Sequence, residues 1–216
     1  MKKKPMKQPR TKEKAVRIAE IQAAAKKVFF KKGYQNTTMQ AIADKAKVSK
    51  GTLYLYYKGK DDLYVALMMP SLEELGRLFR EVEKDLENGK FEDRDFIMEM
   101  FQVFKKYYAY DPDGVRIYQA FQLGNLFEVL SKDTLDKLNH IGLGNYGLAR
   151  RLFARAIELG LVEEVDPVQA GDTLWGLLLG IVQIEENKKR WTKKDHVEST
   201  LEFGYSLLSR ALRVEK

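Results

Sequence analysis

The stretch from residue 37 to residue 63, TTMQAIADKAKVSKGTLYLYYKGKDDL, constrains the fold of this chain more than any other. Its first half has apolar residues at positions i, i+3, i+4 and i+7, which form one face of a short helix. These residues are Met39, Ile42, Ala43 and Ala46. Thr37 or Thr38 can cap the first turn of this helix, because a hydroxyl group there accepts a hydrogen bond from an otherwise unpaired N–H.

The second half of the stretch predicts another short helix that starts at Ser49. The run Lys47-Val48-Ser49 interrupts the first pattern, and Leu53 and Tyr57 then face inward at i and i+4. The other faces carry small polar, basic and phenolic side chains, namely Ser49, Lys50, Gly51, Thr52, Tyr54 and Tyr56. Two short helices joined by a tight turn predict a helix-turn-helix, and such an outer face suits contact with DNA.

The same residues resemble a known family over an extended register. The pattern G-Y-x-x-T-T-M-x-x-I-A, followed by A-x-V-S-K-G-T-L-Y-x-Y-Y-K-x-K-D-D-L, is similar to the DNA-binding domain of the tetracycline-repressor (TetR) family. The resemblance runs from about residue 29 to residue 67. Two positions depart from the family pattern. Gly59 stands where a Ser or Asn often caps the next helix, and Leu55 replaces a residue that is frequently polar or aromatic.

The resemblance implies which side chains contact DNA. Phosphate contacts are implied for Lys50, Tyr54, Tyr56 and Lys60. Contacts at helix starts are implied for Thr38 and Ser49, close approach to the bases for Gly51 and Thr52, and a further contact for Gln40. Phosphate contacts position a protein on the duplex, whereas base contacts carry the sequence preference.

Charge is distributed unevenly along the chain. Residues 1–60 hold 17 Lys and Arg against 3 Asp and Glu, a net charge of +14, and residues 61–216 have a net charge of −7. The two parts together give the overall +7. A generally basic protein would not show this split, so the positive potential belongs to the part that carries the helix-turn-helix, and the pattern indicates nucleic-acid binding.

The composition limits the compartment and the possible sites. The chain has no cysteine, which removes disulfides and thiolate metal sites and fits a reducing cytoplasm. The basic start MKKKPMKQPR is not followed by the apolar stretch of a signal peptide. The longest apolar run, around residues 174–184, is too short to span a bilayer. We therefore expect a cytoplasmic protein without membrane contact.

We expect an all-α fold in three parts. Residues 1–11 are predicted to form a disordered basic arm, residues 12–57 a three-helix DNA-binding domain, and residues 58–216 a ligand-binding and dimerisation domain of about six helices. Gly33 should end the first helix, and Asp-Pro pairs at 111–112 and 166–167 should start later ones, with a last helix over 194–213. Pro70 should kink or interrupt the helix that follows residue 60.

Enzyme chemistry has little support in the sequence. His140 and His196 are far apart and lack patterned partners, and no nucleophile, phosphate-loop or metal motif occurs, so we expect no catalytic residue, no metal and no cofactor. Residues 91–153 are rich in aromatic side chains. These are either core residues or the walls of a cavity for a small, largely apolar effector. The candidate cavity residues are Phe101, Phe104, Tyr108, Tyr118, Phe121, Tyr146 and Trp175.

The last two helices are predicted to form a homodimer interface. A single recognition helix reads only a few base pairs, so two heads must be held about one turn of DNA apart. Small and apolar residues in helical steps supply the candidate faces of a four-helix bundle, namely Thr173, Gly176, Leu177, Gly180 and Ile184 with Leu201, Tyr205, Leu208 and Leu212. The alternative is that both helices pack on their own subunit.

The sequence therefore favours a transcriptional regulator, most simply a repressor that binds a palindromic operator as a homodimer. The family resemblance implies release from DNA when a small effector occupies the helical body. Two alternatives remain open. One is a constitutive DNA binder controlled by a protein partner, and the other is an enzyme or lipid carrier with a DNA-binding head.

Overall fold

The structure is a computed structural model that describes residues 8–91, 94–124, 126–128 and 130–214. Its elements in chain order are α1 (Gln8–Lys32), α2 (Met39–Ala46), α3 (Lys50–Tyr54), α4 (Lys60–Glu87), α5 (Phe96–Tyr110), α6 (Pro112–Leu123), the 3-10 turn η1 (Leu126–Glu128), α7 (Lys132–Glu158), α8 (Pro167–Thr192) and α9 (Val197–Ala211). The described part of the chain contains no β-strand. The predicted all-α fold is confirmed.

The helix starts follow local sequence signals. The hydroxyl of Thr38 accepts from the Ala41 amide at 3.1 Å, which caps α2. Asp111 accepts from the Gly114 amide at 3.0 Å and precedes a proline in the first turn of α6. Asp166 likewise caps α8: it accepts from amides of the first turn and precedes a proline. Each cap satisfies an amide that has no partner within its helix.

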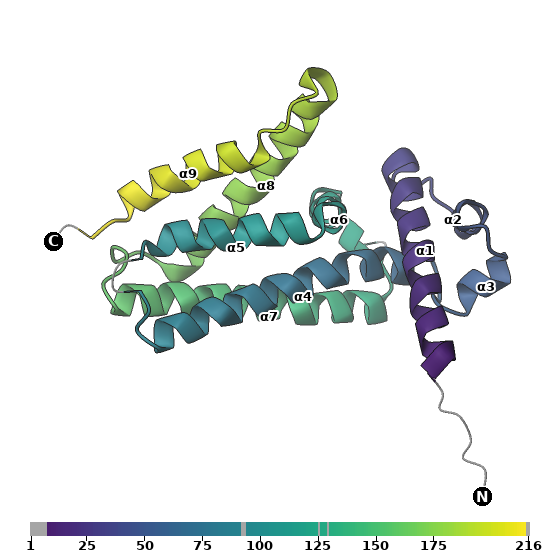
Figure 1. The fold of residues 1–216 in the computed structure, drawn as a ribbon, viewed down its shortest axis with the longest axis horizontal. Helices are drawn as coiled ribbons and strands as arrows, with labels where there is room; N and C mark the ends of the chain where they lie inside the picture. Colours follow the sequence, from purple (N-terminus) through teal and green to yellow (C-terminus); the bar gives the residue numbers. More distant parts are fainter. Residues whose placement is uncertain (1–7, 92–93, 125, 129, 215–216) are drawn as a thin grey trace, which may run out of the picture.

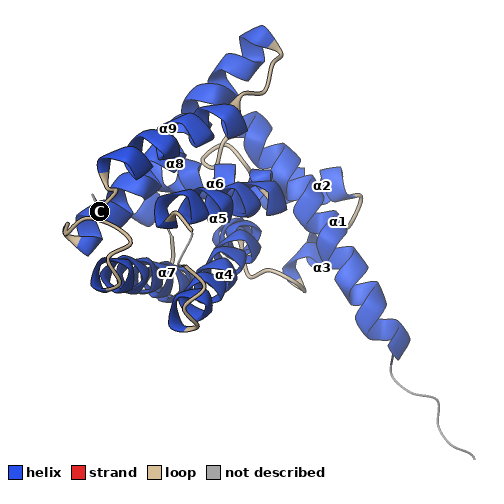
Figure 2. Cartoon of the chain, turned by 60° about the vertical axis from the view of Figure 1, so that its left-hand side comes forward, coloured by secondary structure: helices blue, strands red, loops and turns tan. Residues whose placement is uncertain are grey.

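The chain forms a small head and a larger body (Figure 1). Helices α1 to α3 make the head, and α1 runs across the end of the body. Helix α4 leads from the head into the body, where it lies beside α7, with α5 on the same pair and α8 and α9 on the outer side (Figure 2). With 28 residues, α4 spans about 42 Å. It continues through Pro70, so the predicted interruption does not occur.

Two hydrophobic clusters hold this arrangement together. One lies within the body and joins α4, α5, α7, α8 and α9. The other crosses from head to body, because Leu53 of α3 and Tyr64 of α4 share it with Ile117, Tyr118 and Phe121 of α6. The division at residue 57 stays a prediction about domains, but the second core is continuous across it.

Two predicted boundaries differ from the structure. Helix α1 begins at Gln8, so residues 8–11 belong to a helix rather than to the predicted arm, and residues 1–7 lie outside the described part. Helix α9 begins at Val197 rather than at 194. The Asp195 carboxylate accepts from the Val197 amide at 3.2 Å, and residues 193–196 connect α8 to α9 without regular structure.

Candidate DNA-binding head and ligand cavity

The helix-turn-helix is closed by hydrogen bonds at the turn. Helix α2 ends at Ala46. The residue that caps it, Lys47, has φ 56° in the left-handed region, and the Val48 amide donates to the Ala43 carbonyl at 3.0 Å. The Ser49 hydroxyl then accepts from the Thr52 amide at 3.0 Å and caps α3. As predicted, Leu53 and Tyr57 are buried, which fixes the face that α3 turns outward.

The outward face of α3 carries most of the predicted DNA-binding side chains. Lys50 and Gly51 are exposed, and 47% of Tyr54 is accessible. Thr52 is half-buried, and its hydroxyl lies 2.8 Å from that of Ser49. Tyr56 is also half-buried and packs against the core that head and body share. Lys50, Gly51 and Tyr54 are therefore the most accessible of these side chains, and Thr52 and Tyr56 are less accessible.

Two predicted contacts are engaged within the protein. The Gln40 amide donates to Asp44 at 2.8 Å on the exposed side of α2. The Lys60 ammonium donates to the Tyr34 carbonyl at 3.0 Å and lies 4.2 Å from the centre of the Tyr34 ring. In this arrangement Lys60 fixes the start of α4 to the loop after α1. Its role at a phosphate stays a prediction.

Three further cations on the head were not among the predicted DNA contacts. Lys45, Lys47 and Lys58 are exposed, and within the described residues their ammonium groups have no ion-pair partner. They contribute to the net positive charge of residues 1–60, which was the only sequence feature that pointed to them. Leu55, where the sequence departs from the family pattern, is an apolar side chain that is 82% exposed on the head.

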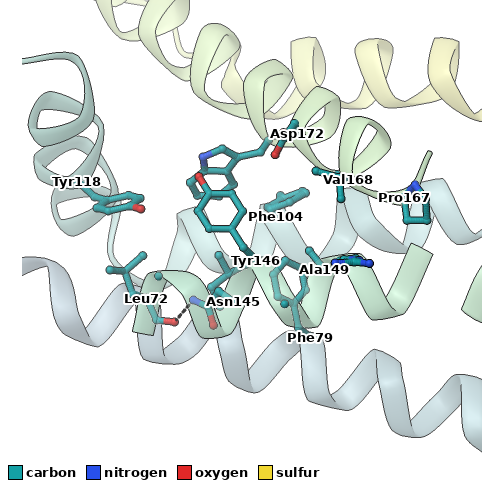
Figure 3. Close-up of a pocket in the computed structure, with 16 residues that line it drawn as sticks. Leu72, Phe79, Phe104, Tyr118, Asn145, Tyr146, Ala149, Pro167, Val168 and Asp172 are labelled. Atoms are coloured by element: carbon teal, nitrogen blue, oxygen red, sulfur yellow. Dashed lines mark hydrogen bonds between the residues drawn. The ribbon is translucent and has the colours of Figure 1, made fainter. Parts of the chain in front are cut away.

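A cavity of about 250 Å³ lies in the body between α4, α6, α7 and α8, beside the Phe104 side chain of α5 (Figure 3). Tyr118 stands at one end with its hydroxyl turned toward the cavity, and Pro167 stands at the other. The lining residues are mostly apolar or small: Leu72, Leu75, Phe79, Phe104, Tyr118, Gly142, Asn145, Tyr146, Gly147, Ala149, Arg150, Pro167, Val168, Gly171, Asp172 and Trp175.

The predicted cavity residues divide into two groups. Phe104, Tyr118, Tyr146 and Trp175 line the cavity. The remaining three do not. Phe101 is buried against Tyr205 of α9, the Tyr108 hydroxyl donates to Glu186 at 2.7 Å, and Phe121 is buried and stacks on Tyr118. Aromatic content could not separate these groups, because it does not say which face of α5 or α6 meets the cavity.

The head is similar in sequence to known proteins. The sequence model described as "Bacterial regulatory proteins, tetR family" matches residues 21–67, which run from the middle of α1 to the start of α4. A curated Bacillus subtilis protein, "Fatty acid metabolism regulator protein", is 33% identical over 75 residues. The DNA-binding head of this chain matches the TetR family. That alignment covers 35% of this chain and 37% of the relative, so the curated match spans little more than a third of either protein.

Solved structures extend the likeness to the body. A tetR-family regulator from Rhodococcus RHA1 has a TM-score of 0.70 at 19% identity and covers 93% of this chain and 98% of its own. FadR from Bacillus subtilis, solved in complex with stearoyl-CoA, has a TM-score of 0.59 at 24% identity and covers 85% and 95%. At these identities the likeness shows the fold, including a helical body behind the head.

Polar contacts tie α6 to both the head and α8. The Lys26 ammonium of α1 pairs with Asp111 at the start of α6, at 2.6 Å. The Arg116 guanidinium of α6 lies 4.9 Å from the centre of the Phe30 ring of α1 and pairs with Glu186 of α8 at 2.6 Å. Helix α6 therefore bridges the head and the helix that forms one wall of the cavity.

The two predicted dimer faces differ in how exposed they are in the single chain. On α8, Thr173, Gly176, Gly180 and Ile184 are exposed and Leu177 is half-buried, so this face is open in the single chain. On α9 the prediction needs correction for two residues, since Leu201 and Tyr205 are 1% and 0% exposed and pack inside their own subunit.

The reason is the direction in which α9 turns its apolar face. The Tyr205 hydroxyl donates to the Leu174 carbonyl of α8 at 2.9 Å, which holds that face on the body. Leu208 and Leu212 are only partly buried against the same core. The apolar side chains that α9 leaves exposed are Phe203 at 63% and Leu207 at 46%. Neither residue was among the predicted dimer contacts, because the buried and the exposed apolar residues of α9 both follow helical spacing.

Among the described residues no helix is long and apolar enough to cross a membrane, and no group of three or more His, Asp or Glu residues is placed to hold a metal ion.

Proposed function

We propose that this protein is a DNA-binding transcriptional regulator of the cytoplasm, acting as a repressor on a palindromic operator as a homodimer. The observation that carries the proposal is the capped two-helix unit with Lys50, Gly51 and Tyr54 on its open side. This surface lies in the part of the chain with a net charge of +14, which favours approach to phosphates. The match of residues 21–67 to a family of bacterial regulatory proteins supports the same function.

The second part of the proposal is that a small, largely apolar effector occupies the cavity and releases the DNA. A ligand lowers DNA affinity only if it binds better to the conformation in which the two recognition helices are wrongly spaced. Tyr118 supplies a physical route, because it lines the cavity and also belongs to the cluster that includes Leu53 of α3. A shift of Tyr118 on ligand binding is therefore passed to the packing of the head.

Fatty acyl thioesters are a second candidate class of effector. The name of the Bacillus subtilis relative refers to fatty acid metabolism, and the FadR structure holds stearoyl-CoA. The apolar walls suit a short acyl segment within about 250 Å³, and the exposed Arg150 would meet an anionic group that stays in solvent. A constitutive binder controlled by a protein partner remains the main rival.

Selection of bound DNA from a random pool tests the proposal. The full-length protein should enrich one palindromic site, and a pool of metabolites should weaken binding to that site. Lys50→Ala should retain the fold and lose affinity for all sequences. Failure to enrich any sequence would remove the regulator proposal. Enrichment that no metabolite affects would favour the constitutive alternative.

A further inference from the structure

The indole nitrogen of Trp175 is a buried donor on a residue that lines the cavity. Trp175 lines the cavity, and its Nε1 has no hydrogen-bond acceptor within the described residues. An indole N–H can only donate, and leaving it buried and unpaired costs about 1–3 kcal/mol. Its orientation is fixed by three neighbouring rings, since those of Phe104, Tyr107 and Tyr118 lie 5.8–6.2 Å away between centroids. An acceptor on a ligand would satisfy this donor.

The volume of the cavity limits the size of that ligand. It measures about 250 Å³. An engineered cavity of about 150 Å³ binds benzene, whereas sites for drug-sized ligands begin at roughly 300 Å³. By proportion the cavity holds about ten non-hydrogen atoms. A stearoyl chain has about twice that number of carbon atoms and would not fit without widening the cavity.

The lining also limits the charge of the ligand. The inner walls are formed by neutral side chains such as Leu72, Phe79 and Phe104. The two charged residues, Arg150 and Asp172, are exposed and opposite in sign. The amide of Asn145 already donates to the Leu72 carbonyl at 2.8 Å. An ionised group inside would lose its hydration without gaining a counter-charge, which is unfavourable.

We propose that the cavity takes a compact, uncharged apolar compound of about ten non-hydrogen atoms, whose carbonyl oxygen accepts a hydrogen bond from Trp175 Nε1. The inference rests on the proposed ligand-responsive function and names the chemical class of its effector. It separates this protein from a regulator that responds to long acyl chains.

Two probes of matched shape test the donor. The bicyclic ketone α-tetralone carries a carbonyl group, and the hydrocarbon tetralin lacks it. Two tryptophans give indole N–H signals in a proton NMR spectrum, and Trp191, at 86% exposed, can be replaced by Phe to assign the signal of Trp175. Addition of α-tetralone should move the Trp175 signal downfield, whereas tetralin should not produce that downfield shift.

Trp175→Phe keeps an aromatic ring in place and removes the donor. Its affinity for α-tetralone should fall about fivefold relative to the parent protein, and its affinity for tetralin should stay within about twofold. Loss of affinity for both probes in equal measure would show packing alone and overturn the hydrogen bond. A Trp175 signal that does not move when the protein is saturated with α-tetralone would also overturn the hydrogen bond.

Two further measurements separate this inference from the proposed function. Absence of binding by both probes, with stoichiometric binding of palmitoyl-CoA, would overturn the compact ligand class while leaving a ligand-responsive regulator intact. Operator affinity of the ligand-free protein is measured in parallel. Failure to bind any DNA would remove the proposed function, whereas ligand binding by the cavity would still be judged by the Trp175 signal and the two probe affinities.

Discussion

The Lys26 ammonium of α1 lies 2.6 and 2.8 Å from the two carboxylate oxygens of Asp111, 85 residues away at the start of α6. Both side chains are less than one-fifth exposed, and one Asp111 oxygen also accepts from the Gly114 amide. The same carboxylate thus caps α6 and anchors the head, so a movement of α6 must change the position of α1.

Lys26→Met should remove this anchor while keeping the apolar stem. Because the partly buried Asp111 loses its partner, we expect the free energy of unfolding to fall by about 1–3 kcal/mol. Urea unfolding measures that change. Asp111→Asn retains a helix cap, so the double variant should be little worse than either single variant. Additive losses would show that the two residues do not act together.

Lys50→Ala should weaken binding to every DNA sequence. Lys50 is exposed at the start of α3, where its charge can meet a phosphate. The slope of log affinity against log salt concentration should become shallower by about 0.9, the value for one phosphate contact. Lys106→Ala on the exposed side of α5 is the control and should change neither quantity. An unchanged slope for Lys50→Ala would remove this residue from the interface.

Gly76→Ala and Gly144→Ala should change stability in opposite directions. A Cβ at Gly76 would lie 2.5 Å from Asn145 Oδ1, so Asn145 would have to move and loosen its bond to the Leu72 carbonyl. We expect a net loss of about 1 kcal/mol on thermal or urea unfolding. Gly144 has open space around it, so alanine there should stabilise α7 by up to about 1 kcal/mol. Equal effects would contradict the close α4–α7 contact.

Glu185 should make the α8–α9 contact sensitive to acid. The Lys188 ammonium 2.8 Å away, helped by the Thr200 hydroxyl at 3.2 Å, lowers the pKa of this buried carboxyl below its ordinary 4.5. A lowered pKa in the folded state gives stability that is present above pH 4.5 and is lost as the pH falls through the folded value.

Unfolding of Glu185→Gln across the acid range tests this sign. The variant should be less stable than the parent protein by about 1–2 kcal/mol at neutral pH, and the difference should shrink below pH 4.5. Glu158→Gln, at an exposed ion pair with Arg155, should differ little from the parent protein. A difference for Glu185→Gln that grows toward acid pH would contradict the assignment.

The sequence predicts most of the head because its signals are local. Thr38 and Ser49 cap helices that they begin, and Leu53 faces inward by simple periodicity. The cavity depends on contacts between distant segments. Leu75 of α4 and Val168 of α8 line it, and nothing in either local pattern shows that the two meet.

The face of α9 shows the same limit. Leu201 and Tyr205 form an apolar stripe that fits a subunit core and a dimer interface equally well. Burial of the Tyr205 hydroxyl on the Leu174 carbonyl decides between the two, and the sequence alone cannot specify that contact.

The most direct test of the account is the affinity of the protein for its selected operator when about five base pairs, half a helical turn, are inserted between the half-sites. A dimer joined through the open face of α8 should lose at least about a hundredfold in affinity, because only one head can then bind. Gly180→Arg, on that open face, should produce folded monomers that bind both operators with the same low affinity. Equal, high affinity of the unaltered protein for both operators would contradict the account.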